Sequence, residues 1–333
     1  MKTLFTALVI TILVSCSIKN SRTIDSILDS PLLVYQISGY EGPKIDINKD
    51  SLVQFLTALH YNIPLSEIES ALKWSPGTTE RNIDALIENK LLTKKGDYYQ
   101  PKLGIFTLER GNLLKEKGQK VANEIADSIN NWLPEIKRIH NEMNISKHHD
   151  FHELSFFYLS NVLLDNFQIQ QVEEVFLNTK RPLRNGSRYY LAIVEDAPNN
   201  TTEPFGIYGN MGLFWNDSIG ISVYGNKRIQ SNVGWDNYED KTIYVFDEKD
   251  MQVISHKMPN AFFPCLLDIL NRNKPNFEAI YRELNFDKEV SFEEFFIFWY
   301  HFIYTETTDV LMSKNSIQKP QDEMFYYQVA KNF

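Results

Sequence analysis

Apolar residues recur at helical spacing from residue 50 onward. Leu52 and Phe55 share one predicted helical face, and the same period of three to four residues continues to residue 92. Thr78 or Thr79 can cap the last helix of this stretch. The pattern predicts three short helices between residues 50 and 92.

A polar turn and a long helix follow. Residues 94–97, Lys-Lys-Gly-Asp, are typical of a hairpin tip between two short strands, and a helix is predicted from about 110 to 143. One face of that helix carries an apolar stripe, formed by Val121, Ile125, Ile129, Trp132, Ile136, Ile139 and Met143. Pro134 lies inside the stripe and should kink the helix. We interpret the stripe as packing on the C-terminal domain, with a homodimer through residues 121–143 as the alternative.

The second half of the chain mixes helical and alternating patterns. Residues 150–178 form a strongly apolar helical run, and helices are predicted again over 261–271, 276–284 and 291–312. Between them, alternation predicts short strands over 189–194, 205–215, 219–224, 242–246 and 251–255. Tight polar loops between these strands favour an antiparallel meander, so the fold class expected is α+β.

The region after residue 77 resembles a known family. It reads TTERNIDALIENKLL…YYQPKLGIFTLERGNLLKEKG and is similar to MarR-like regulators, which have a winged helix-turn-helix fold. The resemblance covers about residues 48–142 and implies a winged-helix-like N-terminal domain. It departs from the family pattern where Asn89-Lys90-Leu91 lacks a glycine and Leu108-Glu109-Arg110-Gly111 lacks a threonine. Because winged helices also bind proteins, the fold alone does not imply DNA binding.

The first sixteen residues carry a targeting pattern. Lys2 precedes a short apolar run that ends at Leu13-Val14-Ser15-Cys16, and this tetrapeptide resembles the lipobox of bacterial lipoproteins. The resemblance implies that residues 1–15 are a signal peptide and that Cys16 is acylated. Residues 16–45 are then a lipidated tether, in which the apolar patch 32–35 can add a strand. In that family Asp after the cysteine is associated with inner-membrane retention, so the resemblance, with Ser17 here, implies an outer-membrane lipoprotein. Because no acidic residue follows Cys16 before Asp25, we expect it to face the periplasm.

Length and charge narrow the picture further. With about 100 to 200 residues per domain, a chain of 333 residues fits two domains, here 46–143 and 144–333. The formal charge of −9 gives no general attraction for nucleic acid, and the third predicted helix offers Arg81 against three carboxylates. We therefore expect no nucleic-acid partner. Two cysteines exclude a disulfide framework, and Cys265 is interpreted as a small buried apolar residue.

One cluster invites metal chemistry. His148 and His152 are four residues apart, so on a helix they would share a face and could hold zinc, with Glu153 as a further ligand. The order His-x-x-x-His-Glu is not the His-Glu-x-x-His of zinc peptidases. In the alternative interpretation Asp150 caps a helix and the histidines are solvated.

Aromatic residues suggest a contact surface. Those in and around the predicted meander are Tyr208, Trp215, Tyr224, Trp235 and Tyr238. Tyrosine and tryptophan combine apolar area with a polar tip, which suits a binding surface, although a place in the core is the leading interpretation.

No catalytic motif is evident, so the leading hypothesis is a non-enzymatic binding protein. It would be anchored to the membrane by its lipid, without a cofactor, and would bind another envelope protein. The first alternative is a metal-dependent periplasmic enzyme that uses the His148/His152 cluster. The second is a winged-helix transcriptional regulator, which requires that the signal peptide assignment be wrong.

Overall fold

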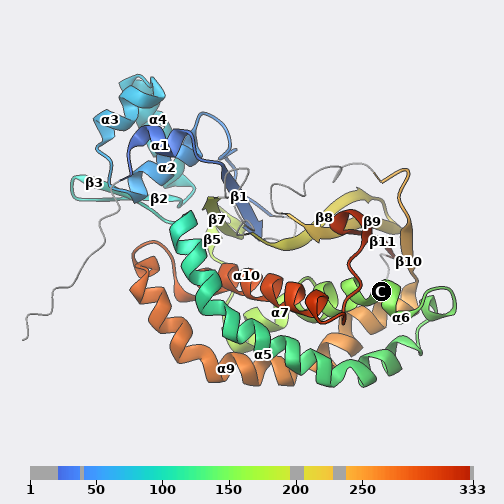
Figure 1. The fold of residues 1–333 in the computed structure, drawn as a ribbon. Helices are drawn as coiled ribbons and strands as arrows, with labels where there is room; N and C mark the ends of the chain where they lie inside the picture. The colour runs from blue at the N-terminus through green and yellow to red at the C-terminus, as the bar shows by residue number, and fades with distance from the viewer. Residues whose placement is uncertain (1–21, 38–40, 196–205, 228–237, 331–333) are drawn as a thin grey trace, which may run out of the picture.

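The computed structural model describes residues 22–37, 41–195, 206–227 and 238–330, and it is a mixed α and β protein with several small sheets (Figure 1). Its α-helices are α1 (Ile24–Leu28), α2 (Leu52–His60), α3 (Leu65–Leu72), α4 (Pro76–Glu88), α5 (Leu108–His140), α6 (Phe151–Phe156), α7 (Ile169–Gln171), α8 (Glu248–Gln252), α9 (Met258–Glu283) and α10 (Phe292–Ser313). Short 3₁₀ and π-helical segments are η1 (Ile145–Lys147), η2 (Phe157–Val162), η3 (Val172–Phe176), η5 (Val253–Lys257), η6 (Phe286–Lys288) and η7 (Gln321–Glu323). The strands are β1 (Leu32–Ile37), β2 (Leu92–Lys95), β3 (Tyr98–Pro101), β4 (Gly104–Phe106), β5 (Leu183–Arg184), β6 (Ser187–Arg188), β7 (Tyr190–Glu195), β8 (Tyr208–Trp215), β9 (Ile219–Asn226), β10 (Ile243–Phe246) and β11 (Met324–Ala330).

A three-stranded sheet, in the order β1-β7-β4, separates two hydrophobic cores. Strand β7 lies antiparallel to β1 and parallel to β4. Leu191 and Ile193 pack into the N-terminal core, whereas Ala192 and Val194 pack into the C-terminal core. The alternation predicted for this stretch is confirmed, because a strand with a core on each face directs successive side chains to opposite sides.

Helices α1 to α4 and the hairpin of β2 and β3 form the N-terminal core above this sheet (Figure 1). The three predicted helices are confirmed as α2, α3 and α4, and Ser75 caps α4 by accepting from the N–H of Thr78. Residues 22–37, assigned to the tether from the sequence, belong to the fold instead. They form α1 and β1, and Ile27 of α1 is fully buried.

The long helix α5 lies under the C-terminal core, where it packs against α9 and α10. Pro134 lies inside it, and α5 visibly bends along its length in Figure 1. Val121, Ile125 and Ile139 of the predicted stripe are buried in the same core. Apart from Trp132, which is partly buried, the stripe is covered by its own chain, so its buried side chains are not a free seam for a homodimer.

The C-terminal sheet is not the predicted meander. Its strand order is β10-β11-β9-β8, in which β11 lies between β9 and β10 and runs parallel to β10. Residues 251–255, predicted as a strand, continue α8 into η5 because the Asp247 side chain caps this helix at the N–H of Asp250. Predicted helices 261–271 and 276–284 join into α9, which runs through Pro264 and Pro275.

Within the described ranges, no helix has the length and apolar character that crossing a bilayer would require.

Three buried or partly buried arginine–glutamate pairs lie around the three-stranded sheet of β1, β7 and β4 and join the two cores. They are Arg22 with Glu195, Arg110 with Glu289, and Arg184 with Glu294. Each glutamate also accepts a backbone N–H from this region, from Leu108, Ile105 and Leu191 respectively. These pairs fix how the N-terminal helices sit on the helical core.

Candidate functional site

Two of the sequence-based assignments lie outside the described residues. Cys16 belongs to residues 1–21 and Trp235 belongs to residues 228–237. Lipidation of Cys16 stays a prediction.

The histidine cluster does not form the helical face that its spacing suggests. Helix α6 begins at Phe151, with Asp150 as its cap, so His148 lies before the helix and His152 lies within it. His149, not His148, contacts Glu153, at 3.1 Å between Nδ1 and Oε2. In the ranges that the structure describes, no three His, Cys, Asp or Glu side chains gather closely enough to hold a metal ion.

The aromatic residues do not share one surface. Tyr208 and Tyr224 are buried in the C-terminal core, where both pack against Phe156. Trp215 is 46% exposed at the end of β8, and Tyr238 packs on the opposite face of the sheet. Tyr208 and Tyr224 therefore have the structural role that the core interpretation gives them.

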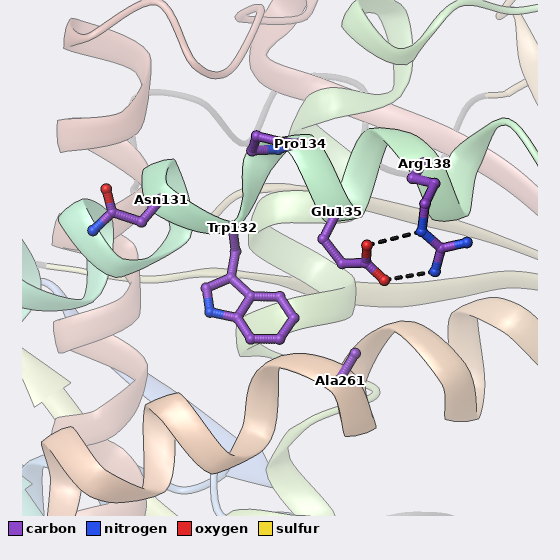
Figure 2. A pocket seen from close by; sticks show the side chains of 6 residues that line it. All are labelled: Asn131, Trp132, Pro134, Glu135, Arg138 and Ala261. Atoms are coloured by element: carbon purple, nitrogen blue, oxygen red, sulfur yellow. Dashed lines mark hydrogen bonds and ion pairs between the residues drawn. The ribbon is translucent and has the colours of Figure 1, made fainter.

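A hollow of about 660 Å³ opens between α5 and α9 at the proline turn of α5. In Figure 2, Trp132 points from α5 toward α9, where Ala261 lies opposite. Asn131 stands at one end of the hollow, and Glu135 and Arg138 stand at the other. The Ala261 side chain is only a methyl group, and Trp132 is half-buried, with its ring centre 6.4 Å from that of Phe262.

The residues around this hollow combine apolar surface with groups that can form hydrogen bonds. Arg138 donates two hydrogen bonds to Glu135, at 2.8 and 2.6 Å, and these bonds lower the pKa of the Glu135 carboxyl. The indole N–H of Trp132 makes no hydrogen bond with any residue that the structure describes, so it can donate to a ligand. An aromatic face with a polar rim is common at protein-binding sites.

A second hollow, of about 370 Å³, lies on another side of the same turn of α5. Leu133 and Lys137 of α5 line it together with Asp150, Phe151, His152, Asn315 and Ser316. The ammonium of Lys137 lies 5.3 Å from the centre of the Phe151 ring. His152 of the predicted histidine cluster thus borders a hollow beside the helix cap Asp150, although no metal-ligand group forms there among the described residues.

Pro134 accounts for the position of both hollows. Proline has no N–H to give to the carbonyl four residues before it, and its ring pushes that carbonyl away, so the helix opens locally. The residues on either side of it, 131–138, therefore stand between two hollows. We name Asn131, Trp132, Pro134, Glu135, Arg138 and Ala261 the proline-turn face.

A buried polar cluster lies elsewhere, where the β8–β9 hairpin meets the helices. Asn161 of η2 and Asn210 of β8 exchange hydrogen bonds of 3.1 and 2.9 Å, and Asn210 also donates to Asp165, at 3.1 Å. The Lys227 ammonium donates to the Asn210 carbonyl, at 2.9 Å, and the Tyr327 hydroxyl donates to the Asn210 side chain, at 2.8 Å. Residues of η2, β8 and β11 meet here, together with Asp165, which lies between η2 and α7, and Lys227, which follows β9.

The pKa values of the ionisable groups in this cluster are displaced from their ordinary values. Burial raises the pKa of Asp165 to about 7, although Tyr304, Lys227 and Asn210 oppose the rise. Burial lowers the pKa of His301 to about 4 and also lowers the pKa of Lys227. Displaced pKa values of this kind are concentrated at functional sites but also occur in structural networks.

Asp165, Asn210, Lys227 and His301 were not singled out from the sequence. A signal did exist, because Asp165 interrupts the apolar run 150–178 and His301 interrupts the aromatic run of α10. A polar residue on an otherwise apolar helix must find a partner, but the sequence does not say which one.

Comparison with known proteins adds no relative: no family model, curated protein or solved structure matches the chain.

Proposed function

We propose that this chain is a lipid-anchored protein of the cell envelope that binds another envelope protein without catalysis. Cys16 carries the lipid, and the proline-turn face carries the contact. The anchor is an outer-membrane one, and the body of the protein faces the periplasm.

The observation that carries the binding proposal is the pair of hollows beside Pro134. The larger one presents Trp132 across from Ala261, and tryptophan is among the residues that contribute most to protein interfaces. Its volume of about 660 Å³ accommodates several side chains of a partner. We infer that an apolar side chain of the partner packs on the Trp132 indole. A carbonyl oxygen of the partner beside it accepts a hydrogen bond from the indole N–H.

The N-terminal helices and hairpin are proposed to be a winged-helix-like module that serves protein contact, not DNA contact. Glu80, Arg81, Asp84 and Glu88 are exposed on α4, so three carboxylates accompany one guanidinium on the helix that would read DNA. Asn82, the residue of α4 suited to an adenine edge, is buried.

The anchor is tested by labelling cells with a radioactive or clickable fatty acid. We expect label on the wild-type protein, none on Cys16→Ala, and unchanged labelling of Cys265→Ala. An unlabelled wild-type protein that keeps its first fifteen residues would contradict the anchor.

The contact is tested by placing a photo-crosslinking amino acid at Asn131 in intact cells. The matched control carries it at Glu283, which is exposed at the C-terminal end of α9 and belongs neither to the proline-turn face nor to the N-terminal module. We expect a discrete adduct from position 131 and none from position 283. Equal adduct patterns from both positions would contradict a contact at the proline-turn face.

A further inference from the structure

Asp165 and His301 form a pair that the proposed binding function does not use. The Nε2 atom of His301 lies 3.8 Å from Oδ1 of Asp165, and both residues are 6% exposed. They lie under the β8–β9 hairpin, where Asp165 also accepts a hydrogen bond from Asn210 of β8.

The hydrogen bonds of His301 decide which ring nitrogen carries its proton. Nδ1 lies 2.6 Å from the carbonyl oxygen of Ile297, one turn earlier in α10. A carbonyl oxygen only accepts, so Nδ1 carries the hydrogen. In the neutral ring Nε2 is then an acceptor, and its lone pair faces the carboxyl group of Asp165.

An acceptor so placed favours a protonated Asp165. The carboxylic acid can donate toward Nε2, whereas an ionised carboxylate would set a negative charge against a lone pair in a buried site. A charged His301 would reverse this preference, but burial lowers the pKa of His301 to about 4.

The other ionisable groups around Asp165 come from each element packed against it. They are Lys227 after β9, Tyr224 of β9, Tyr300 and Tyr304 of α10, and Tyr327 of β11. Burial raises the pKa of all four tyrosines, which therefore stay neutral. Lys227 is a nearby cation whose charge opposes the rise of the Asp165 pKa, and its ammonium donates to the Asn210 carbonyl.

We infer that Asp165 and His301 form a proton-binding site that fastens the β8–β9 hairpin to the helical core. With the proton bound, Asp165 sets no negative charge against Nε2 of His301, 3.8 Å away, and still accepts from Asn210, so loop and hairpin stay joined beside α10. Release of the proton leaves a buried negative charge between α10 and β8, which the Lys227 ammonium offsets only in part. The hairpin is then held less firmly, although its hydrogen bond from the N–H of Tyr208 to Thr305 persists.

The proton is detected directly by infrared difference spectroscopy between pH 5.5 and pH 8.5. A protonated carboxyl group absorbs apart from carboxylates, and we expect its band at the lower pH to disappear at the higher one. Asp165→Asn should remove this band, and Asp309→Asn, which changes a carboxylate on α10 that accepts from Tyr208, should leave it intact.

Two further measurements separate proton binding from a merely structural role. In His301→Gln an amide replaces Nε2 and can donate to the carboxylate, so the midpoint of the band should move to lower pH. Amide exchange of β8 and β9, corrected for intrinsic rates, should quicken above pH 7 in the wild type but not in Asp165→Asn.

The inference is overturned by a wild-type protein without the band, or by a midpoint that His301→Gln does not move. It is equally overturned if hairpin exchange has the same pH dependence in Asp165→Asn as in the wild type. If Asp165→Asn does not fold, the His301→Gln titration decides alone. These outcomes do not bear on the proline-turn face, whose test is the crosslink from position 131.

Discussion

Buried carboxylates occupy two junctions of the molecule, and the groups around them differ. Beside the small sheet, His60 and Arg110 together outweigh the burial of Glu289 and lower its pKa. Glu294 bonds to Arg184 and is also attracted by Lys102, but there burial prevails and raises its pKa. At the hairpin junction Asp165 has no arginine, and its pKa rises to about 7. At these junctions the balance between burial and the cations beside a carboxylate therefore sets the direction in which its pKa shifts.

From this comparison we expect the largest loss of folding stability when Arg184 is replaced. Arg184→Met leaves Glu294 buried without its cation and removes the hydrogen bonds to the carbonyl oxygens of Tyr189 and Lys102. Breaking a buried ion pair costs about 3–5 kcal/mol, so the free energy of unfolding in urea should fall by that amount. The matched control is Arg272→Met, which removes an exposed guanidinium and should leave stability unchanged.

A double variant sharpens this result. Arg184→Met with Glu294→Leu removes both charges, and it should regain most of the stability that the single variant loses. If Arg184→Met unfolds no more easily than Arg272→Met, the pair does not fix the junction.

The next effect is a dependence on pH at Asp165. Its folded pKa of about 7 lies above the ordinary value of 3.8, so the folded state holds a proton that the unfolded state has released between those values. Stability should therefore fall as pH rises through this window, by at most about 1.4 kcal/mol per pH unit. Thermal melts from pH 4 to 8 should show this slope in the wild type and a flatter profile in Asp165→Asn. Equal slopes would place the titrating group elsewhere.

The smallest effect concerns a neutral hydrogen bond at the same junction. Tyr327→Phe removes the hydroxyl that donates to Asn210, at 2.8 Å, and should cost about 1 kcal/mol of unfolding free energy. Tyr98→Phe, at an exposed tyrosine of β3, should cost nothing measurable. A loss equal to that of Arg184→Met would show that neutral contacts, not charges, dominate both junctions.

Local periodicity made much of the fold predictable. The alternation at 189–194 and the aromatic run of α10 each persist long enough to indicate a strand and a helix. The strand predicted over residues 251–255 was wrong, because their apolar character fits a strand and a helix equally well. The local feature that indicates a helix is the cap at Asp247. The meander failed because β11 pairs with β9 across a long stretch of chain, which no local pattern encodes.

The sites were less accessible from the sequence. The spacing of His148 and His152 is meaningful only within one helix, and the chain turns between them at Asp150. The larger hollow depends on Trp132 lying opposite Ala261, and the Asp165 cluster depends on residues from segments far apart in the chain. Such juxtapositions arise from tertiary packing, so the local clues were Pro134 for the hollows and the polar residues Asp165 and His301 in apolar runs for the cluster.

The most direct test of the binding proposal is the crosslink from position 131, compared with and without Ala261→Arg. The arginine fills the larger hollow from the α9 side without changing α5. The account predicts a discrete partner adduct in intact cells that disappears when Ala261→Arg is added, while the amount of folded protein stays the same. An adduct of equal yield in both backgrounds would contradict binding at the proline-turn face.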